Sequence, residues 1–235
     1  MPKVLEGIIT AEKAGTKMLA VLIDPEKFDC STAQKFLRKM PFLTTHIFIG
    51  GSTCTPEAVE ECTKAIKAET HLPVVLFPGD HQQISGKADA LLFLSLLSGR
   101  NPDYLIGQQV RSVPLISKTR LEIIPTAYLL IDGGKETAVQ RASKTQPLPQ
   151  KDVQQIVDTA MAGKYMGKRL IYLEAGSGAN IPVAAGIISA VKEAVQLPVI
   201  VGGGIRTKEQ LEAAYRAGAN MVVIGTAFEK GHFFL

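Results

Sequence analysis

The chain has 235 residues, of which 46% are hydrophobic, 26 are basic and 22 are acidic. This length suits one large domain or two small ones, of which we expect a single domain spanning residues 1–235, and the composition is that of a folded protein and not of a disordered one. The net charge of +4 is too small to indicate nucleic-acid binding. It is compatible with an anionic substrate or with contact to an acidic membrane surface.

The cysteine count and the apolar runs bear on location. The odd number of cysteines, 3, argues against a disulfide framework, so we expect a reducing compartment. No signal-peptide core follows the N-terminus, and no apolar run approaches the ~20 residues of a membrane span. We therefore expect a soluble, cytoplasmic protein whose contact with a membrane, where it occurs, is peripheral.

Eight short runs rich in leucine or β-branched residues alternate with longer segments of helical spacing. Their continuous hydrophobicity is typical of parallel strands buried on both faces. Strand–helix units in this number, joined by right-handed crossovers, predict a closed (β/α)8 barrel, the TIM barrel of the α/β class. The runs are 18–24, 46–51, 73–77, 90–94, 123–131, 170–174, 198–202 and 221–225.

Capping signals mark helix starts between these runs. Ser31 with Gln34, and Thr207 with Gln210, have the spacing of a capping box, in which a hydroxyl and an amide satisfy free backbone donors. Both pairs therefore predict that a helix begins at the hydroxyl residue.

Two segments depart from the alternation. Residues 78–89 are too short and too poor in apolar periodicity for a covering helix, so we expect a missing or degenerate third helix and a gap in the outer wall. Residues 136–150 contain Lys144 and two prolines and predict an exposed excursion before the next helix begins near Lys151.

The last three predicted strands end in glycine-rich turns. These turns are Glu-Ala-Gly-Ser-Gly at 174–178, three glycines at 202–204, and Gly225 with Thr226. Glycine lets backbone N–H groups approach an anion, and the late loops of barrels commonly hold phosphate. Tight turns alone would explain one such cluster, but three consecutive strand ends favour a phosphate site. The spacing fits neither a dinucleotide fingerprint nor a P-loop.

Oxygen ligands follow the first two predicted strands. Asp24 ends the first run, and Gly-Gly-Ser-Thr at 50–53 ends the second. A carboxylate at a strand tip beside hydroxyls suits a hard cation such as Mg²⁺. A helix cap would equally explain Asp24, so both interpretations stay open. The histidines, none of which has metal-ligand spacing, are His46, His71, His81 and His232.

Together these motifs resemble the geranylgeranylglyceryl phosphate synthase family. The segments that carry the resemblance are 22–25, 50–53, 98–102, 172–178, 202–205 and 225–226. It extends over essentially the whole chain and looks like the second of the family's two groups, because of the Ser-Gly-Arg-Asn-Pro segment at 98–102. It implies a modified barrel whose third helix is replaced. It also implies Mg²⁺-dependent transfer of a prenyl group to sn-glycerol 1-phosphate, which forms 3-O-geranylgeranyl-sn-glyceryl 1-phosphate and the first ether bond of archaeal-type lipids.

The resemblance also assigns residues to two sites. Asp24 and Ser52 match the magnesium positions, with Thr53 as a further candidate. We predict that Glu174, the only plausible base in the matching set, accepts the proton of the attacking glycerol hydroxyl. The residues that match the glycerol-phosphate site are Tyr172, Leu173, Glu174, Ala175, Gly176, Ser177, Gly178, Gly203, Gly204, Gly225 and Thr226.

The prenyl donor needs a place for its diphosphate and an apolar trough for its tail. Arg100 is a candidate diphosphate contact, although a surface position would also explain it. We expect the trough to run across the top of the barrel toward the missing third helix. Its candidate lining residues, each of which core packing would also explain, are Phe77, Leu96, Leu97, Tyr104 and Ile106.

Two other functions stay open at this point. A phosphosugar isomerase or synthase would share the phosphate grip but would need neither the metal nor the trough. A non-catalytic barrel that binds a phosphometabolite would bind phosphate without turnover. The partners expected from the resemblance are glycerol 1-phosphate, a prenyl diphosphate and further copies of the chain, as a dimer or a hexamer.

Overall fold

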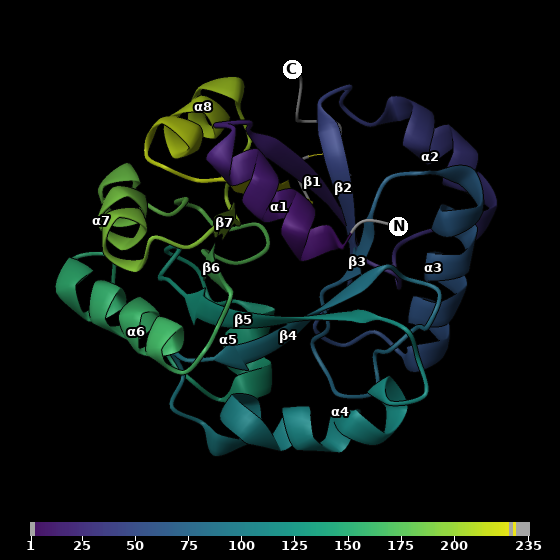
Figure 1. The fold of residues 1–235 in the computed structure, drawn as a ribbon, viewed down its shortest axis with the longest axis horizontal. Coiled ribbons are helices and arrows are strands. Elements are labelled where there is room, and N and C mark those ends of the chain that lie inside the picture. Colours follow the sequence, from purple (N-terminus) through teal and green to yellow (C-terminus); the bar gives the residue numbers. More distant parts are fainter. Residues whose placement is uncertain (1–2, 226–227, 229–235) are drawn as a thin grey trace.

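The structure is a computed structural model that describes residues 3–225 and 228. Its centre is a closed barrel of parallel strands in which each strand pairs with its neighbours in chain order and β8 pairs with β1 (Figure 1). Every strand overlaps one of the predicted runs, so the predicted TIM barrel is confirmed. The strands are β1 (Met18–Ile23), β2 (Thr44–Ile49), β3 (Val74–Leu76), β4 (Ala90–Leu96), β5 (Glu122–Leu130), β6 (Leu170–Glu174), β7 (Val199–Gly202) and β8 (Met221–Ile224).

Helices surround the barrel, and α1 crosses in front of it (Figure 1). No helix in the described part of the chain combines the length and the apolar character that crossing a bilayer requires. A π-helical turn, Asp103–Gly107, leads directly into α4. The helices are α1 (Val4–Lys13), α2 (Ala33–Lys39), α3 (Pro56–Glu69), α4 (Gln108–Ile116), α5 (Ala138–Ser143), α6 (Val153–Tyr165), α7 (Ala185–Val195) and α8 (Lys208–Arg216).

The prediction that the helix expected after the third strand is missing is confirmed: no helix lies between β3 and β4. Residues 77–89, which join β3 to β4, contain turns and bends but no helix. The buried Gln83 ties this segment down, because its side chain accepts from the Gly79 amide at 2.8 Å and donates to the Cys54 carbonyl at 2.9 Å. Hydrogen bonds therefore hold the segment where a helix would otherwise cover the barrel.

Side chains alternate along each strand between the barrel interior and the surrounding helices, as strand geometry requires. In β6, Leu170 and Tyr172 belong to the cluster that fills the barrel. Ile171 and Leu173 belong instead to the cluster packed under the helices. Alternation thus directs Tyr172, and Glu174 after it, toward the barrel axis at the carboxyl end of β6.

One capping prediction is confirmed and the other is wrong. Thr207 and Gln210 form the predicted capping box at the start of α8. The chain before α2 is capped instead by Asp29, whose carboxylate accepts from the Ser31 amide at 3.0 Å and from its hydroxyl at 2.7 Å. Ser31 lies inside the short helical turn Cys30–Thr32 that Asp29 caps, and α2 begins after Thr32, so Ser31 does not form a capping box with Gln34.

The prediction of an exposed excursion at 136–150 is wrong in part: Lys144 is exposed and the next helix begins at Val153, near Lys151, but the segment is not without structure. This segment contains α5, which begins with a capping box of Thr137 and Gln140. The buried hydroxyls of Ser143 and Thr145 lie 2.7 Å apart. The buried residues of this segment are largely small and polar, and hydrogen bonds satisfy their hydroxyls. Because few of them are apolar, the sequence of this segment shows no apolar period.

Glu122, at the start of β5, fixes α1 to the amino end of the barrel. Its carboxylate accepts from the Val4 amide and, at 3.3 Å, from the Leu5 amide. We expect Glu122→Ala to lower the free energy of unfolding by about 1–2 kcal/mol, because it removes a cap and a favourable charge at a helix N-terminus. Urea denaturation measures this loss. Glu69→Ala, at an exposed carboxylate, is the control, and equal stability of the two variants would contradict the assignment.

Candidate active site

A cavity of about 860 Å³ opens at the carboxyl ends of the strands. It is lined by the turns after β1, β2, β3 and β5 to β8, and it extends along β4 and the inner side of α4. The structure thus brings the predicted metal residues and the predicted phosphate residues to one cavity. The predicted residues that line it are Asp24, Ser52, Thr53, Tyr172, Glu174, Gly176, Ser177, Gly178, Gly203, Gly204 and Gly225.

Three other predicted site residues stand apart from this set. Leu173 and Ala175 are buried in the cluster under the helices, so their side chains face away from the cavity. Neither residue lines the cavity. Thr226 lies outside the described residues, as does His232.

The turns after β6 and β7 meet so closely that only glycine fits between them. A Cβ atom on Gly203 would lie 2.5 Å from both Glu174 Oε1 and the Gly176 amide nitrogen. Gly203 also has a φ of 82°, in the left-handed region that glycine adopts without strain. On Gly202, a Cβ would lie 2.6 Å from both Glu174 Oε2 and the Tyr172 hydroxyl. The backbones of these two turns, at Gly176 and at Gly202 and Gly203, therefore form one continuous surface beside Glu174, which we call the glycine wall.

Two basic side chains that the sequence analysis missed flank this wall. Arg206 donates to the carbonyls of Gly178, at 3.4 Å, and Ala179. The Lys135 ammonium lies 3.8 Å from the position of a Cβ on Gly178, and both basic residues line the cavity. Each follows a glycine pair shortly after a strand, which is the sequence signal that could have found them. They make this side of the cavity suitable for an anion.

Glu174 is a buried carboxylate, with 6% of its surface exposed. Its Oε1 accepts from the Gly176 amide at 2.7 Å. Burial raises the pKa of Glu174 to about 7, and the Gly176 amide and the adjacent Tyr172 hydroxyl oppose that shift. Such a carboxyl can both hold and release a proton near neutral pH.

Tyr172 has a buried hydroxyl that makes no hydrogen bond of standard geometry among the described residues. Its ring stacks on Phe77 at 5.0 Å between centroids, and burial raises the pKa of its hydroxyl well above the ordinary value. The hydroxyl is therefore a neutral donor. A buried polar atom without a partner is costly, so this hydroxyl is poised to bond a ligand in the cavity.

The other side of the cavity has oxygen ligands. Asp24 accepts from the Glu26 amide at 3.2 Å and pairs with Lys27, so it caps a turn. No helix begins at this turn, so the helix-cap interpretation of Asp24 is wrong. A Cβ on Gly51 would lie 3.0 Å from Asp24 Oδ1, which places the turn that carries Ser52 directly against this carboxylate. One carboxylate with neighbouring hydroxyls fits a hard divalent cation that completes its shell with water and substrate oxygens. The described residues include no cluster of three His, Cys, Asp or Glu side chains able to hold a metal.

The apolar part of the cavity lies along β4 and the inner side of α4. Phe77, Leu96 and Tyr104 line it, as expected for the trough. Leu97 points the opposite way, since it directly follows the inward-facing Leu96, and Ile106 is 59% exposed on the outer side. The sequence analysis missed the remaining apolar lining residues, which include Ile84, Phe93, Leu94, Tyr128 and Val139.

Arg100 does not reach this cavity. Together with Leu97 it lines a separate hollow against α6, and its guanidinium donates to the Leu97 carbonyl. Its φ of 56° is left-handed. The structure therefore leaves Arg100 without a place at the cavity in which we expected a diphosphate.

One side of the cavity suits an anion, and the cavity continues into an apolar extension. These features define the class of enzymes that bind an anionic group and an apolar group in one site at the end of a barrel. Residues 10–232 match the PcrB family. The chain is 56% identical to geranylgeranylglyceryl phosphate synthase of Zunongwangia profunda, over 99% of this chain and 100% of that protein. It is 42% identical to the protein of that name from Thermococcus gammatolerans, over 91% of this chain and 85% of that one.

A solved structure supports the same family. (S)-3-O-geranylgeranylglyceryl phosphate synthase from Thermoplasma acidophilum, in complex with its substrate sn-glycerol-1-phosphate, superposes with a TM-score of 0.89. It is 38% identical, and the match covers 98% of this chain and 93% of that one. The chain belongs to the PcrB family, the family of these synthases, so the resemblance found in the motifs is confirmed. Its place in the second of the two groups stays a prediction.

The raised pKa of Glu174 predicts a pH-dependent effect on stability. A carboxyl with a pKa of about 7 in the folded chain, against an ordinary value of 4.5, binds its proton more tightly when folded. Folding therefore loses stability as the pH rises from about 4.5 to 7, by about 3 kcal/mol in total. We expect Glu174→Gln to melt at a higher temperature than the unchanged protein at pH 8, and the two to converge at pH 5. Calorimetry at both values tests this, and equal melting temperatures at pH 8 would contradict it.

Proposed function

We propose that this chain is a prenyltransferase that joins sn-glycerol 1-phosphate to geranylgeranyl diphosphate and forms 3-O-geranylgeranyl-sn-glyceryl 1-phosphate within one TIM-barrel domain, 1–235. The observation that carries the proposal is a cavity with a main-chain wall beside a buried carboxylate, oxygen ligands opposite, and an apolar extension. The printed names of the relatives, and the glycerol-phosphate complex of the Thermoplasma acidophilum enzyme, support it. A phosphosugar isomerase would have no use for the apolar extension.

The acceptor site lies beside the glycine wall. We assign its phosphate to the backbone amides of 177–178, 203–204 and 225, with Lys135 and Arg206 providing positive charge at the edge. The part of Thr226 stays a prediction from the sequence. Main-chain donors suit this task because they are fixed before the ligand arrives. The unpartnered Tyr172 hydroxyl would donate to the glycerol or to its phosphate.

Glu174 is the proposed general base. It orients the glycerol and accepts the proton of the terminal hydroxyl as that oxygen bonds to C1 of the prenyl group. The bond from C1 to the diphosphate breaks with its electron pair going to the diphosphate. A carboxyl whose pKa is about 7 accepts a proton more readily than an ordinary glutamate would.

Asp24 and Ser52, with Thr53, would hold Mg²⁺. When bound there, the ion neutralises charge on the diphosphate leaving group. Asp24 contributes the one full negative charge of this ligand set, while the hydroxyls of Ser52 and Thr53 are neutral oxygen donors. Cytoplasmic location, peripheral contact with a membrane and assembly into a dimer or a hexamer stay predictions from the sequence.

Product analysis tests the function directly. With sn-glycerol 1-phosphate, Mg²⁺ and geranylgeranyl diphosphate, we expect mass spectrometry to detect the ether product. Because the protonated carboxyl cannot act as a base, kcat/KM should fall as the pH drops through about 7, and Glu174→Gln should lose about 100-fold or more. The exposed Glu136→Gln is the matched control. Binding of glycerol phosphate without turnover would favour the non-catalytic barrel that binds a phosphometabolite. Near-normal turnover of Glu174→Gln would rule out Glu174 as the base.

Asp24→Asn separates the metal site from the acceptor site. Replacing the charged ligand with a neutral one should raise the Mg²⁺ concentration for half-maximal activity by about 10-fold or more. Calorimetric affinity for sn-glycerol 1-phosphate without metal should stay unchanged, because that site lies beside the glycine wall. Asp158→Asn, an exposed change on α6, is the control. An unaltered Mg²⁺ requirement in Asp24→Asn would rule out Asp24 as a ligand.

A further inference from the structure

Basic side chains lie on both sides of the cavity. Among the described lining residues, Lys135 and Arg206 flank the glycine wall, and Lys27 pairs with Asp24. The fourth basic side chain is that of His81. It belongs to the helix-free segment between β3 and β4, to which the reaction as proposed assigns no part.

The backbone before His81 is packed against the turn that carries Ser52. A Cβ on Gly79 would lie 2.7 Å from the Gly51 carbonyl oxygen and 2.9 Å from Ser52 Cα. The buried Gln83 bonds both the Gly79 amide and the Cys54 carbonyl, so it holds the two loops together. His81 is therefore placed on the side of the cavity where the diphosphate is expected.

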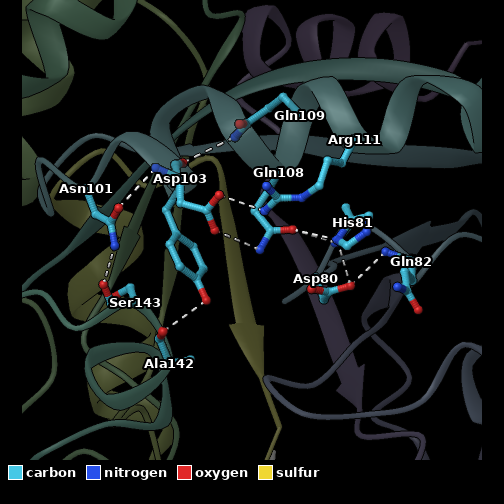
Figure 2. A network of polar contacts seen from close by, with 11 residues as sticks. Asp80, His81, Gln82, Asn101, Asp103, Gln108, Gln109, Arg111, Ala142 and Ser143 are labelled. Atoms are coloured by element: carbon cyan, nitrogen blue, oxygen red, sulfur yellow. Dashed lines mark hydrogen bonds and ion pairs between the residues drawn. The ribbon is translucent and has the colours of Figure 1, made fainter.

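A chain of polar contacts fixes the imidazole of His81 (Figure 2). Oε1 of Gln108 accepts from the His81 amide and from Nδ1, both at 3.0 Å. The Gln108 amide group is oriented in turn by donating to Asp103 at 3.5 Å, and Asp103 pairs with Arg111 at 2.7 Å. Asp80 Oδ1 also lies 3.1 Å from His81 Nδ1.

These contacts leave the two ring nitrogens with different tasks. An amide oxygen and a carboxylate oxygen can only accept, so Nδ1 carries a proton. Nε2 has no hydrogen-bond partner within the described part of the chain, although the side chain lines the cavity. Since diphosphate oxygens only accept hydrogen bonds, a contact through Nε2 is one that the imidazolium form of the ring makes.

We propose that His81 binds the diphosphate of the prenyl donor through Nε2, as a positive charge in addition to the metal. This rests on the proposed function. As the bond from the prenyl C1 to the diphosphate breaks, the electron pair moves to the diphosphate, and the protonated ring stabilises that charge without gaining or losing a proton. Gln108 acts as a positioning residue, because it touches His81 and orients the ring.

Two substitutions separate binding from support of the loop. Asn at 81 can keep the contact that Nδ1 makes with Gln108, whereas Gln reaches the position of Nε2 and restores a neutral donor there. With Mg²⁺ present, His81→Asn should weaken binding of inorganic diphosphate and raise the KM for geranylgeranyl diphosphate by about 10- to 100-fold. His81→Gln should recover part of the loss, and the Kd for sn-glycerol 1-phosphate should not change in either variant.

The exposed His71→Asn serves as the control and should change none of these constants. Unchanged diphosphate binding in His81→Asn overturns the proposal. The proposal is also overturned if His81→Gln binds diphosphate no better than His81→Asn does. A lower melting temperature with equal losses of affinity for both substrates overturns it too, since either result means that His81 only supports the loop. Calorimetry with inorganic diphosphate needs no turnover. A protein that binds it through His81 but makes no ether product would therefore refute the proposed function and leave this site standing.

Discussion

The contact between the end of β7 and the Glu174 side chain is the constraint on which the site depends. Glu174 and Gly202 are partners in the β6–β7 ladder, and the Ala175 amide donates to the Gly202 carbonyl at 3.0 Å. The register of the barrel therefore sets the distance between the carboxylate and the glycine turn. Any side chain on Gly202 or Gly203 would displace Glu174, so the two glycines and the acid form one unit.

This arrangement places a group that favours water in a site that excludes it. Burial disfavours the charged carboxylate, and the Gly176 amide and the adjacent Tyr172 hydroxyl only partly oppose that effect. The barrel compensates through apolar residues that pack on both faces of its strands. A buried carboxyl with a raised pKa is what proton transfer near neutral pH requires, so the instability of the site and its usefulness have one cause.

Much of the fold followed from the sequence because parallel strands buried on both faces give continuous apolar runs. The helix start at Thr207 could be predicted as well, because a capping box depends only on hydrogen bonds between residues close together in the sequence. Residues 136–150 were assigned wrongly because Ser143 and Thr145 are buried with satisfied hydroxyls, which no hydropathy pattern reveals. Leu97 was misplaced for a different reason: the side that a residue faces depends on its position relative to the strand, and a shift of one position reverses it. Arg100 follows the turn after β4 and takes the exposed position that was its other interpretation. His81 follows no glycine pair after a strand and reaches the cavity only through tertiary structure.

The missing helix links the two halves of the cavity. A covering helix between β3 and β4 would bury this side of the barrel, whereas the segment present leaves an apolar extension beside α4. Polar contacts replace the packing that the helix would have supplied: Gln83 joins the segment to the turn after β2, and Gln108 joins it to α4. The same replacement brings His81 to the cavity edge. Because a retained phosphate needs a fixed grip while a leaving diphosphate must be released, main-chain amides suit the first, and an exchangeable ion with a titratable ring suits the second.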